Sequence, residues 1–151
     1  MCTRNSISAA PTEDVDNSLA REAGPYDYYR GKYRYSNTLG KHGISVSANG
    51  TTDGGYKDDS DYDQQKATVR HDYAGEHWDV RTVLDAANLN QNTAGFIEGY
   101  QAYKDNDLKK RNPNPNAYRD AWSVRLYSAA SIALNDTNTL TITPYLRDND
   151  M

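Results

Sequence analysis

The chain has 151 residues and a formal net charge of −4, and its mean hydropathy is −0.96. This length fits one domain or a piece of a larger one. No run of about 18 apolar residues is present, which excludes a helical membrane protein. A transmembrane barrel is not excluded, because its loops and inward positions are polar. The sequence has no basic stripe, so nucleic acid is not an expected partner.

Six strands are predicted in chain order from a two-residue alternation of apolar and polar side chains. The first spans about 17–36, with Pro25 as a bulge or bend because proline cannot donate to a ladder. The second spans about 44–52, the third about 64–73 and the fourth about 78–90. After a loop of roughly thirty residues, the fifth spans about 121–134. The sixth contains Leu140, Ile142, Pro144 and Leu146.

The connections between these strands alternate in length. Short turns are expected at 38–43, 74–77 and 135–138, and long polar loops at 53–63 and at about 91–119. A soluble sandwich has no reason to sort its loops in this way, whereas outer-membrane barrels place short turns inside and long loops outside. We therefore expect an all-β, antiparallel up-and-down meander of about six strands, part of a larger transmembrane β-barrel. All three turns should lie at one edge of the sheet.

Each strand has one apolar and one polar face, and aromatic residues lie near the strand ends. Val124 and Leu126 are expected to face lipid. Tyr33, Tyr35, Tyr73 and Trp78 lie beside the expected short turns and Trp122 lies beside the long loop, where the aromatic girdles of a barrel would fall. The residues expected to face the lumen are Arg30, Lys32, Arg34, Arg70, Asp72, Asp79, Arg81, Asp85, Arg125 and Tyr127.

The sequence shows no pattern typical of catalysis, cofactor binding or metal binding. Nucleophile-elbow and P-loop motifs are absent. The three histidines lie in separate segments with no cysteine or spaced carboxylates beside them, which argues against zinc. The acidic loop at 58–63 lacks the glycine and glutamate of a calcium-binding EF-hand. We expect neither an enzyme nor a cofactor or metal site.

Several segments, in this order, resemble a TonB-dependent receptor, a ligand-uptake protein of the Gram-negative outer membrane. NSISAAPT at 5–12 is similar to the end of the receptor's plug domain, and NSLAREAGPYDYYRGKYRYSNTLG at 17–40 to the first barrel strand and its turn. NLNQNTAGFIEGYQAYKD, from Asn88, and NPNPNAYRDAWS, from Asn112, resemble barrel sequence. TPYLR at 143–147 resembles a strand end that leads outward.

The resemblance implies that residues 1–14 are the tail of the plug and 15–151 the N-terminal part of the barrel. A complete receptor is several times longer, so we expect an internal fragment that itself lacks a signal peptide. The implied function is uptake of an iron–siderophore complex or similar ligand across the outer membrane. The implied partners are that ligand, the plug, the TonB coupling complex and outer-membrane lipid.

Basic and aromatic side chains of the long loop form the candidate ligand surface, because together they suit a flat, anionic, aromatic ligand. They are Phe96, Tyr100, Tyr103, Lys104, Lys109, Lys110, Arg111 and Tyr118. The alternative interpretation is a soluble, tyrosine-rich β-module that binds glycan or protein.

Overall fold

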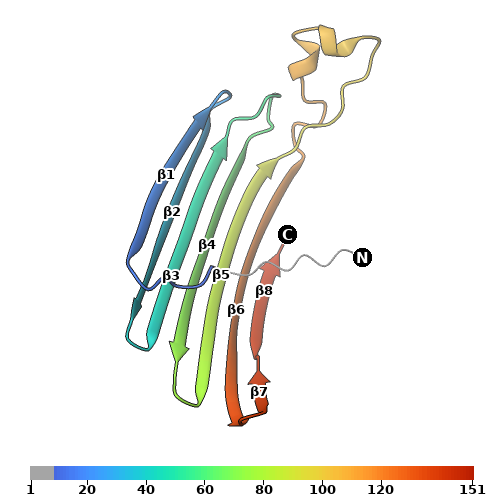
Figure 1. The fold of residues 1–151 in the computed structure, drawn as a ribbon. Coiled ribbons are helices and arrows are strands. Elements are labelled where there is room, and N and C mark those ends of the chain that lie inside the picture. Colours follow the sequence, from blue (N-terminus) through green and yellow to red (C-terminus); the bar gives the residue numbers. More distant parts are fainter. Residues whose placement is uncertain (1–8) are drawn as a thin grey trace.

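The computed structural model describes residues 9–151 as one curved antiparallel sheet (Figure 1). Neighbouring strands in the sheet are consecutive in the chain from β1 to β7, and β8 departs from this order by pairing with β6. The predicted all-β, up-and-down antiparallel meander is confirmed. Most of the predicted plug tail, residues 1–8, lies outside the described residues. The strands are β1 (Asp16–Gly24), β2 (Tyr28–Leu39), β3 (His42–Asp53), β4 (Tyr62–Ala74), β5 (Trp78–Asn92), β6 (Tyr118–Asn135), β7 (Asn138–Ile142) and β8 (Tyr145–Asp150).

The three short turns lie at one edge of the sheet, as predicted (Figure 1). Gly40 begins the two-residue β2–β3 turn with φ +60°, which glycine adopts without strain at the first position of a type II′ turn. In the β6–β7 turn, the Asn135 side-chain oxygen accepts hydrogen bonds from the backbone N–H groups of Thr137 and Asn138, at 3.1 and 2.9 Å. These local devices explain why the turn residues could be identified from the sequence.

The predicted first strand at 17–36 is wrong, because this segment forms a hairpin. β1 and β2 pair directly, with Gly24 opposite Tyr28, and Pro25–Asp27 form the turn. Tyr26 and Asp27 both take positive φ, at 63° and 56°. The hairpin lets both strands make ladder hydrogen bonds, whereas one long strand would leave proline inside it. The edge with the long loops therefore also carries one short turn.

The predicted sixth strand is interrupted and forms β7 and β8. Both pair with β6 in one continuing register, in which Ala130 lies opposite Ile142 and Tyr127 opposite Tyr145. Between them, the Ser128 N–H donates to the Pro144 carbonyl oxygen at 3.1 Å. Pro144 has no N–H with which to return this bond, so the ladder is broken there.

The long β5–β6 connection, residues 93–117, contains two short 3₁₀ helices, η1 (Ala102–Lys104) and η2 (Leu108–Lys110). Among residues 9–151, only Val83 and Ala102 are buried hydrophobic residues, because the sheet has no second layer packed against it. Within the same range, no helix is long and apolar enough to cross a membrane.

Candidate functional site

The register gives the sheet one polar and one apolar face. Cross-strand partners in an antiparallel sheet point to the same side. One such row crosses five strands and contains Arg34, Ser47, Thr68, Asp85 and Arg125. All the residues expected to face a lumen lie on this polar face: Arg30, Lys32, Arg34, Arg70, Asp72, Asp79, Arg81, Asp85, Arg125 and Tyr127. That this face lines a lumen stays a prediction.

Charged groups on the polar face pair with one another along the sheet. Arg125 donates to Asp85 at 2.6 Å, and the Thr68 hydroxyl donates to the same carboxylate at 2.8 Å. Asp72 accepts from Arg70 at 2.5 Å and lies 3.6 Å from Arg81. These contacts link side chains of β4, β5 and β6 across the polar face.

The β1–β2 hairpin carries a third charged group on this face. Lys32 donates to Glu22 at 2.6 Å, and Arg30 lies 3.9 Å from the same side chain. These ion pairs join side chains of the sheet to one another.

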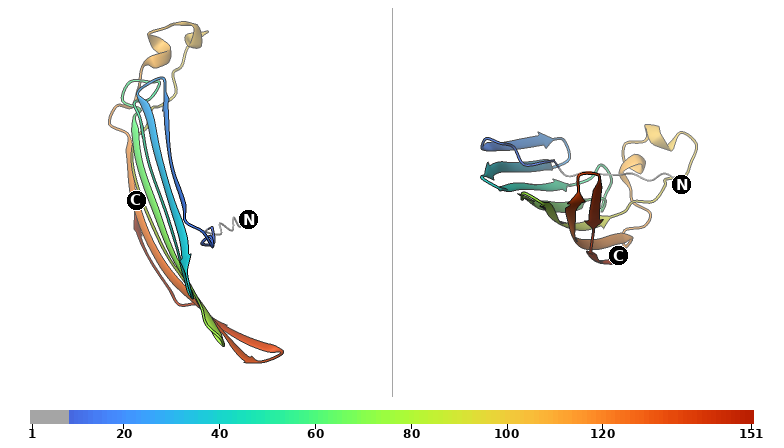
Figure 2. Two further views of the ribbon diagram at one scale, coloured as in Figure 1. Left: turned by 60° about the vertical axis from the view of Figure 1, so that its left-hand side comes forward. Right: turned by 60° about the horizontal axis from the view of Figure 1, so that its bottom comes forward.

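The N-terminal segment, residues 9–15, crosses the polar face, and the sheet curves around the side on which it lies (Figure 2). The Thr12 N–H donates to the Ser36 hydroxyl at 2.8 Å, and the Ser45 hydroxyl donates to the Ala9 carbonyl at 3.3 Å. Gly43 is buried, and a side chain there would collide with the Pro11 ring. The segment is therefore held by hydrogen bonds to side chains of β2 and β3.

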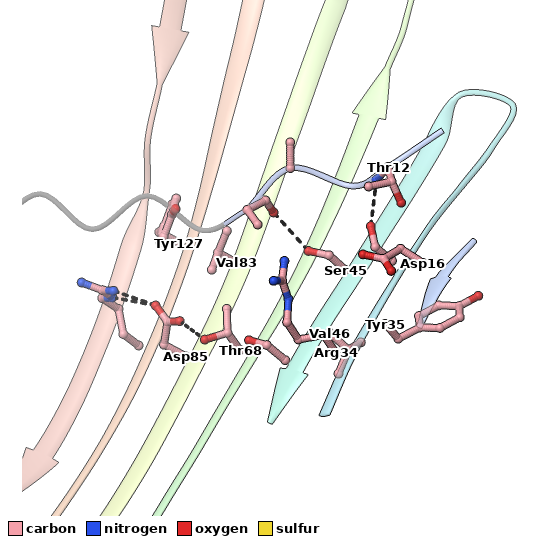
Figure 3. Close-up of a pocket in the computed structure, with 15 residues that line it drawn as sticks. Thr12, Asp16, Arg34, Tyr35, Ser45, Val46, Thr68, Val83, Asp85 and Tyr127 are labelled. Atoms are coloured by element: carbon pink, nitrogen blue, oxygen red, sulfur yellow. Dashed lines mark hydrogen bonds and ion pairs between the residues drawn. The ribbon is translucent and has the colours of Figure 1, made fainter. Parts of the chain in front are cut away.

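A groove of about 710 Å³ lies between this segment and the strands (Figure 3). Arg34, Tyr127 and the ion-paired Asp85 and Arg125 line it. Val83, only 1% exposed, lines it together with Ala9 and Ala10. Two carboxylates line the groove, those of Asp16 and Asp85, and Asp85 accepts hydrogen bonds from Arg125 and Thr68. Its chemistry suits the holding of a peptide segment.

The opposite face carries an apolar band. One of its rows is apolar across six strands and consists of Tyr35, Val46, Val69, Leu84, Leu126 and Leu146. Val124 and Leu126 lie on this face, while Ser123 and Arg125 lie on the other, as the alternation predicted.

Aromatic rings mark both ends of the apolar face. Next to the short turns, Tyr73 packs against Trp78 with ring centroids 4.7 Å apart, and against His42 at 5.0 Å. Trp122 lies on the same face toward the long loops, opposite Asn88. The predicted positions of Tyr33 and Tyr35 beside a short turn are wrong, because both lie in the middle of β2.

The two long loops are tied to each other through the buried Asn112. Its side-chain N–H donates to the Asp59 carbonyl at 3.0 Å, and its side-chain oxygen accepts from the Gly95 N–H at 3.3 Å. Lys57 donates to the Gly95 carbonyl at 2.6 Å, and the Asp58 N–H donates to the Lys110 carbonyl at 2.8 Å. The loops therefore form one connected structure, which we call the loop cap (residues 54–61 and 93–117).

Asp105 organises the turn that precedes η2. Its side chain accepts hydrogen bonds from the backbone N–H groups of Leu108 and Asp107, at 3.0 and 2.9 Å. These bonds favour the charged carboxylate and hold the pKa of Asp105 below its ordinary value of 3.8.

The structure brings most of the predicted ligand residues to the surface of the loop cap. Phe96 and Tyr100 are 94% and 95% exposed, and the Lys104 ammonium lies 5.8 Å from the Tyr103 ring centroid. Tyr118 is the exception, because it is the first residue of β6 and has the parity of Trp122 on the apolar face. The residues placed in the loop cap are Phe96, Tyr100, Tyr103, Lys104, Lys109, Lys110 and Arg111.

Comparisons with known proteins give no identification: no family model, no curated protein and no solved structure matches this chain. Sequence reasoning missed two features of the candidate site. Asn112 lies in an asparagine–proline run that gave no sign of which asparagine is buried. The docking of residues 9–15 depends on small residues, Gly43 and Ser36, whose importance is visible only once the strands are paired.

Proposed function

We propose that the chain is the N-terminal part of the barrel of a TonB-dependent outer-membrane receptor that takes up an iron–siderophore complex or a similar ligand. Residues up to 14 would be the end of its plug domain. One observation carries the proposal: the N-terminal segment lies on a charged face of the sheet, while the opposite face is apolar between two sets of aromatic rings. A barrel whose lumen holds a plug requires this arrangement.

The height of the apolar band supports the proposal. Trp122 lies at one end of the band on β6, and Ile132, the partner of Trp78, lies at the other. At about 3.3 Å per residue, this stretch of β6 is about 33 Å long. At the roughly 40° tilt of barrel strands it would span about 25 Å along the membrane normal, which is the height of the apolar band in outer-membrane barrels.

The open edges of the sheet also support the proposal. Among residues 9–151, no strand pairs with the outer side of β1 or of β7 and β8. Unpaired backbone groups are costly in lipid, so membrane sheets close on themselves. Further strands of the same receptor would supply the missing partners.

In this proposal the loop cap faces outward, and its exposed aromatic and basic side chains meet the ligand. Phe96 and Tyr100 would offer ring faces, while Lys104 and Arg111 would offer positive charge. Hydrogen bonds through Asn112 would hold these side chains in place. Energy would come from the coupling complex through the plug. The chain's own residues supply binding and positioning, and no bond-making chemistry.

The test is to follow the reading frame in the source DNA in both directions, and then to delete the complete frame from the source strain. We expect a plug domain upstream, further barrel strands downstream, and loss of uptake of at least one ferric siderophore in the deletion strain. A frame with no plug upstream would contradict the proposal. That result would favour the alternative, a soluble module that binds glycan or protein. Recovery of the chain as a monodisperse monomer in detergent-free buffer would support this alternative.

A further inference from the structure

Two of the three histidines, which are far apart in the sequence, meet on the apolar face near the short turns. The His42 Nδ1 and the His71 Nε2 lie 3.1 Å apart, and the rings are nearly parallel, with centroids 5.3 Å apart. His42 is the first residue of β3 and pairs with Tyr73, so His71 is its diagonal neighbour on β4. The register of two hairpins therefore creates this pair.

The pair lies at the surface of the apolar face. His42 is exposed and His71 is half-buried. The Tyr73 ring packs on His42 from one side, at 5.0 Å, and holds it in orientation. The nearest turns carry a Lys41–Glu76 ion pair at 3.6 Å, which already engages both of these charges.

The separation of these nitrogens matches a two-histidine metal chelate. Metal–nitrogen bonds to histidine are about 2.0–2.1 Å long. Two such bonds span about 3.1 Å when they meet at about 98°, between the square-planar and tetrahedral angles. In such a chelate each metal–nitrogen bond lies about 40° from the line between the two nitrogens, so both rings must rotate when the ion binds.

We propose that His42 and His71 form a surface chelate for a divalent first-row transition-metal ion, with water completing the coordination. In the metal-free pair, the N–H of one ring donates a hydrogen bond to the facing nitrogen of the other ring. On metal binding, this ring moves the proton to its other nitrogen, and both facing nitrogens become ligands. The ion would join hairpin β2–β3 to hairpin β4–β5. The inference does not rest on the proposed uptake function, in which this pair would lie on the apolar band, near its short-turn end.

Imidazole ligands select among metals. Cu²⁺ should bind more tightly than Zn²⁺ or Ni²⁺, whereas Mg²⁺ and Ca²⁺, which prefer oxygen ligands, should not bind. The sequence argued against a zinc site because no third protein ligand is present. Within the described residues, no cluster of three or more metal-ligating side chains exists, and the proposed chelate needs only two.

The test titrates Ni²⁺ and Zn²⁺ into the tag-free full chain, folded in detergent micelles, in a Cys2→Ser background that removes the competing thiol. We expect one ion per chain by calorimetry. His42→Ala and His71→Ala should each weaken binding by about tenfold or more, because one of two ligands is lost. His77→Ala is the matched control, since His77 lies in the β4–β5 turn at the same edge, and it should change affinity by less than about twofold.

A second readout does not depend on the variants folding. In the unsubstituted chain, paramagnetic Ni²⁺ should broaden the ring NMR signals of His42 and His71 before that of His77. Equal broadening of all three rings, equal affinity of all three variants, or no binding to the folded chain would each overturn the proposal.

Discussion

The docking of the N-terminal segment on the polar face depends on the missing side chain of Gly43. A Cβ atom at this position would lie 2.8 Å from both Cβ and Cγ of Pro11. Carbon atoms normally approach to about 3.5–4.0 Å, so Gly43→Ala forces the proline ring to move by about 1 Å. β3 is held by ladders on both sides, so the segment must yield. Overpacking of this size costs about 1–3 kcal/mol.

The Thr12 amide reports on this change, because its hydrogen bond to the buried Ser36 hydroxyl exists only while the segment is docked. In Gly43→Ala, its hydrogen-exchange protection should fall by about 5- to 150-fold, the equivalent of 1–3 kcal/mol. Gly50→Ala is the control: Gly50 is also on β3, and nothing lies within 4 Å of its added methyl group. Unchanged protection in Gly43→Ala, or an equal loss in Gly50→Ala, would show that the Pro11–Gly43 contact does not hold the segment on the sheet.

Three further predictions concern the loops and the last strands. Asn112→Ala should destabilise the loop cap by about 1–3 kcal/mol, because it leaves buried partners unsatisfied, and loop amides should exchange faster than in the exposed control Asn106→Ala. Pro144→Val should stabilise the strand pair by about 0.5–1.5 kcal/mol in denaturant titrations, since the new N–H can bond to the Ser128 carbonyl; a loss of stability would contradict this. The pKa of Asp105 is lowered in the folded loop, so the stability that its carboxylate contributes to the loop is fully present above pH 3.8. This stability is lost as the pH falls through the pKa of the folded state. Asp105→Asn should abolish this acid transition in the NMR spectra of the loop.

The fold was predictable where local sequence determines it. Strict alternation in β3 to β6 identified the strands and their faces, and turn residues such as Gly40 and Asn135 identified the short connections. The β1–β2 hairpin was not predicted, because the same parity runs through both strands and Tyr26 lacks the usual preference for positive φ. Only the pairing of the two strands distinguishes a hairpin from one long strand.

The candidate site was predictable only in part. Side chains that share a strand face, such as Arg70 and Asp72, follow from the alternation alone. Contacts between distant segments do not, because they depend on register and on loop paths. The bonds of Asn112 to the other loop and the approach of His42 to His71 are of this kind.

In the proposed receptor, one face of the sheet meets lipid and the other lines a lumen. The most direct measurement compares Val69→Arg with Thr68→Arg in the complete reading frame, scoring heat-modifiable barrel in outer-membrane fractions. Val69 lies on the apolar face between Val46 and Leu84, so a charge there should cost about 2–4 kcal/mol and reduce assembled barrel strongly. Thr68 lies on the polar face beside Asp85, so its substitution should cost much less. Equal losses, or a greater loss from Thr68→Arg, would contradict the account.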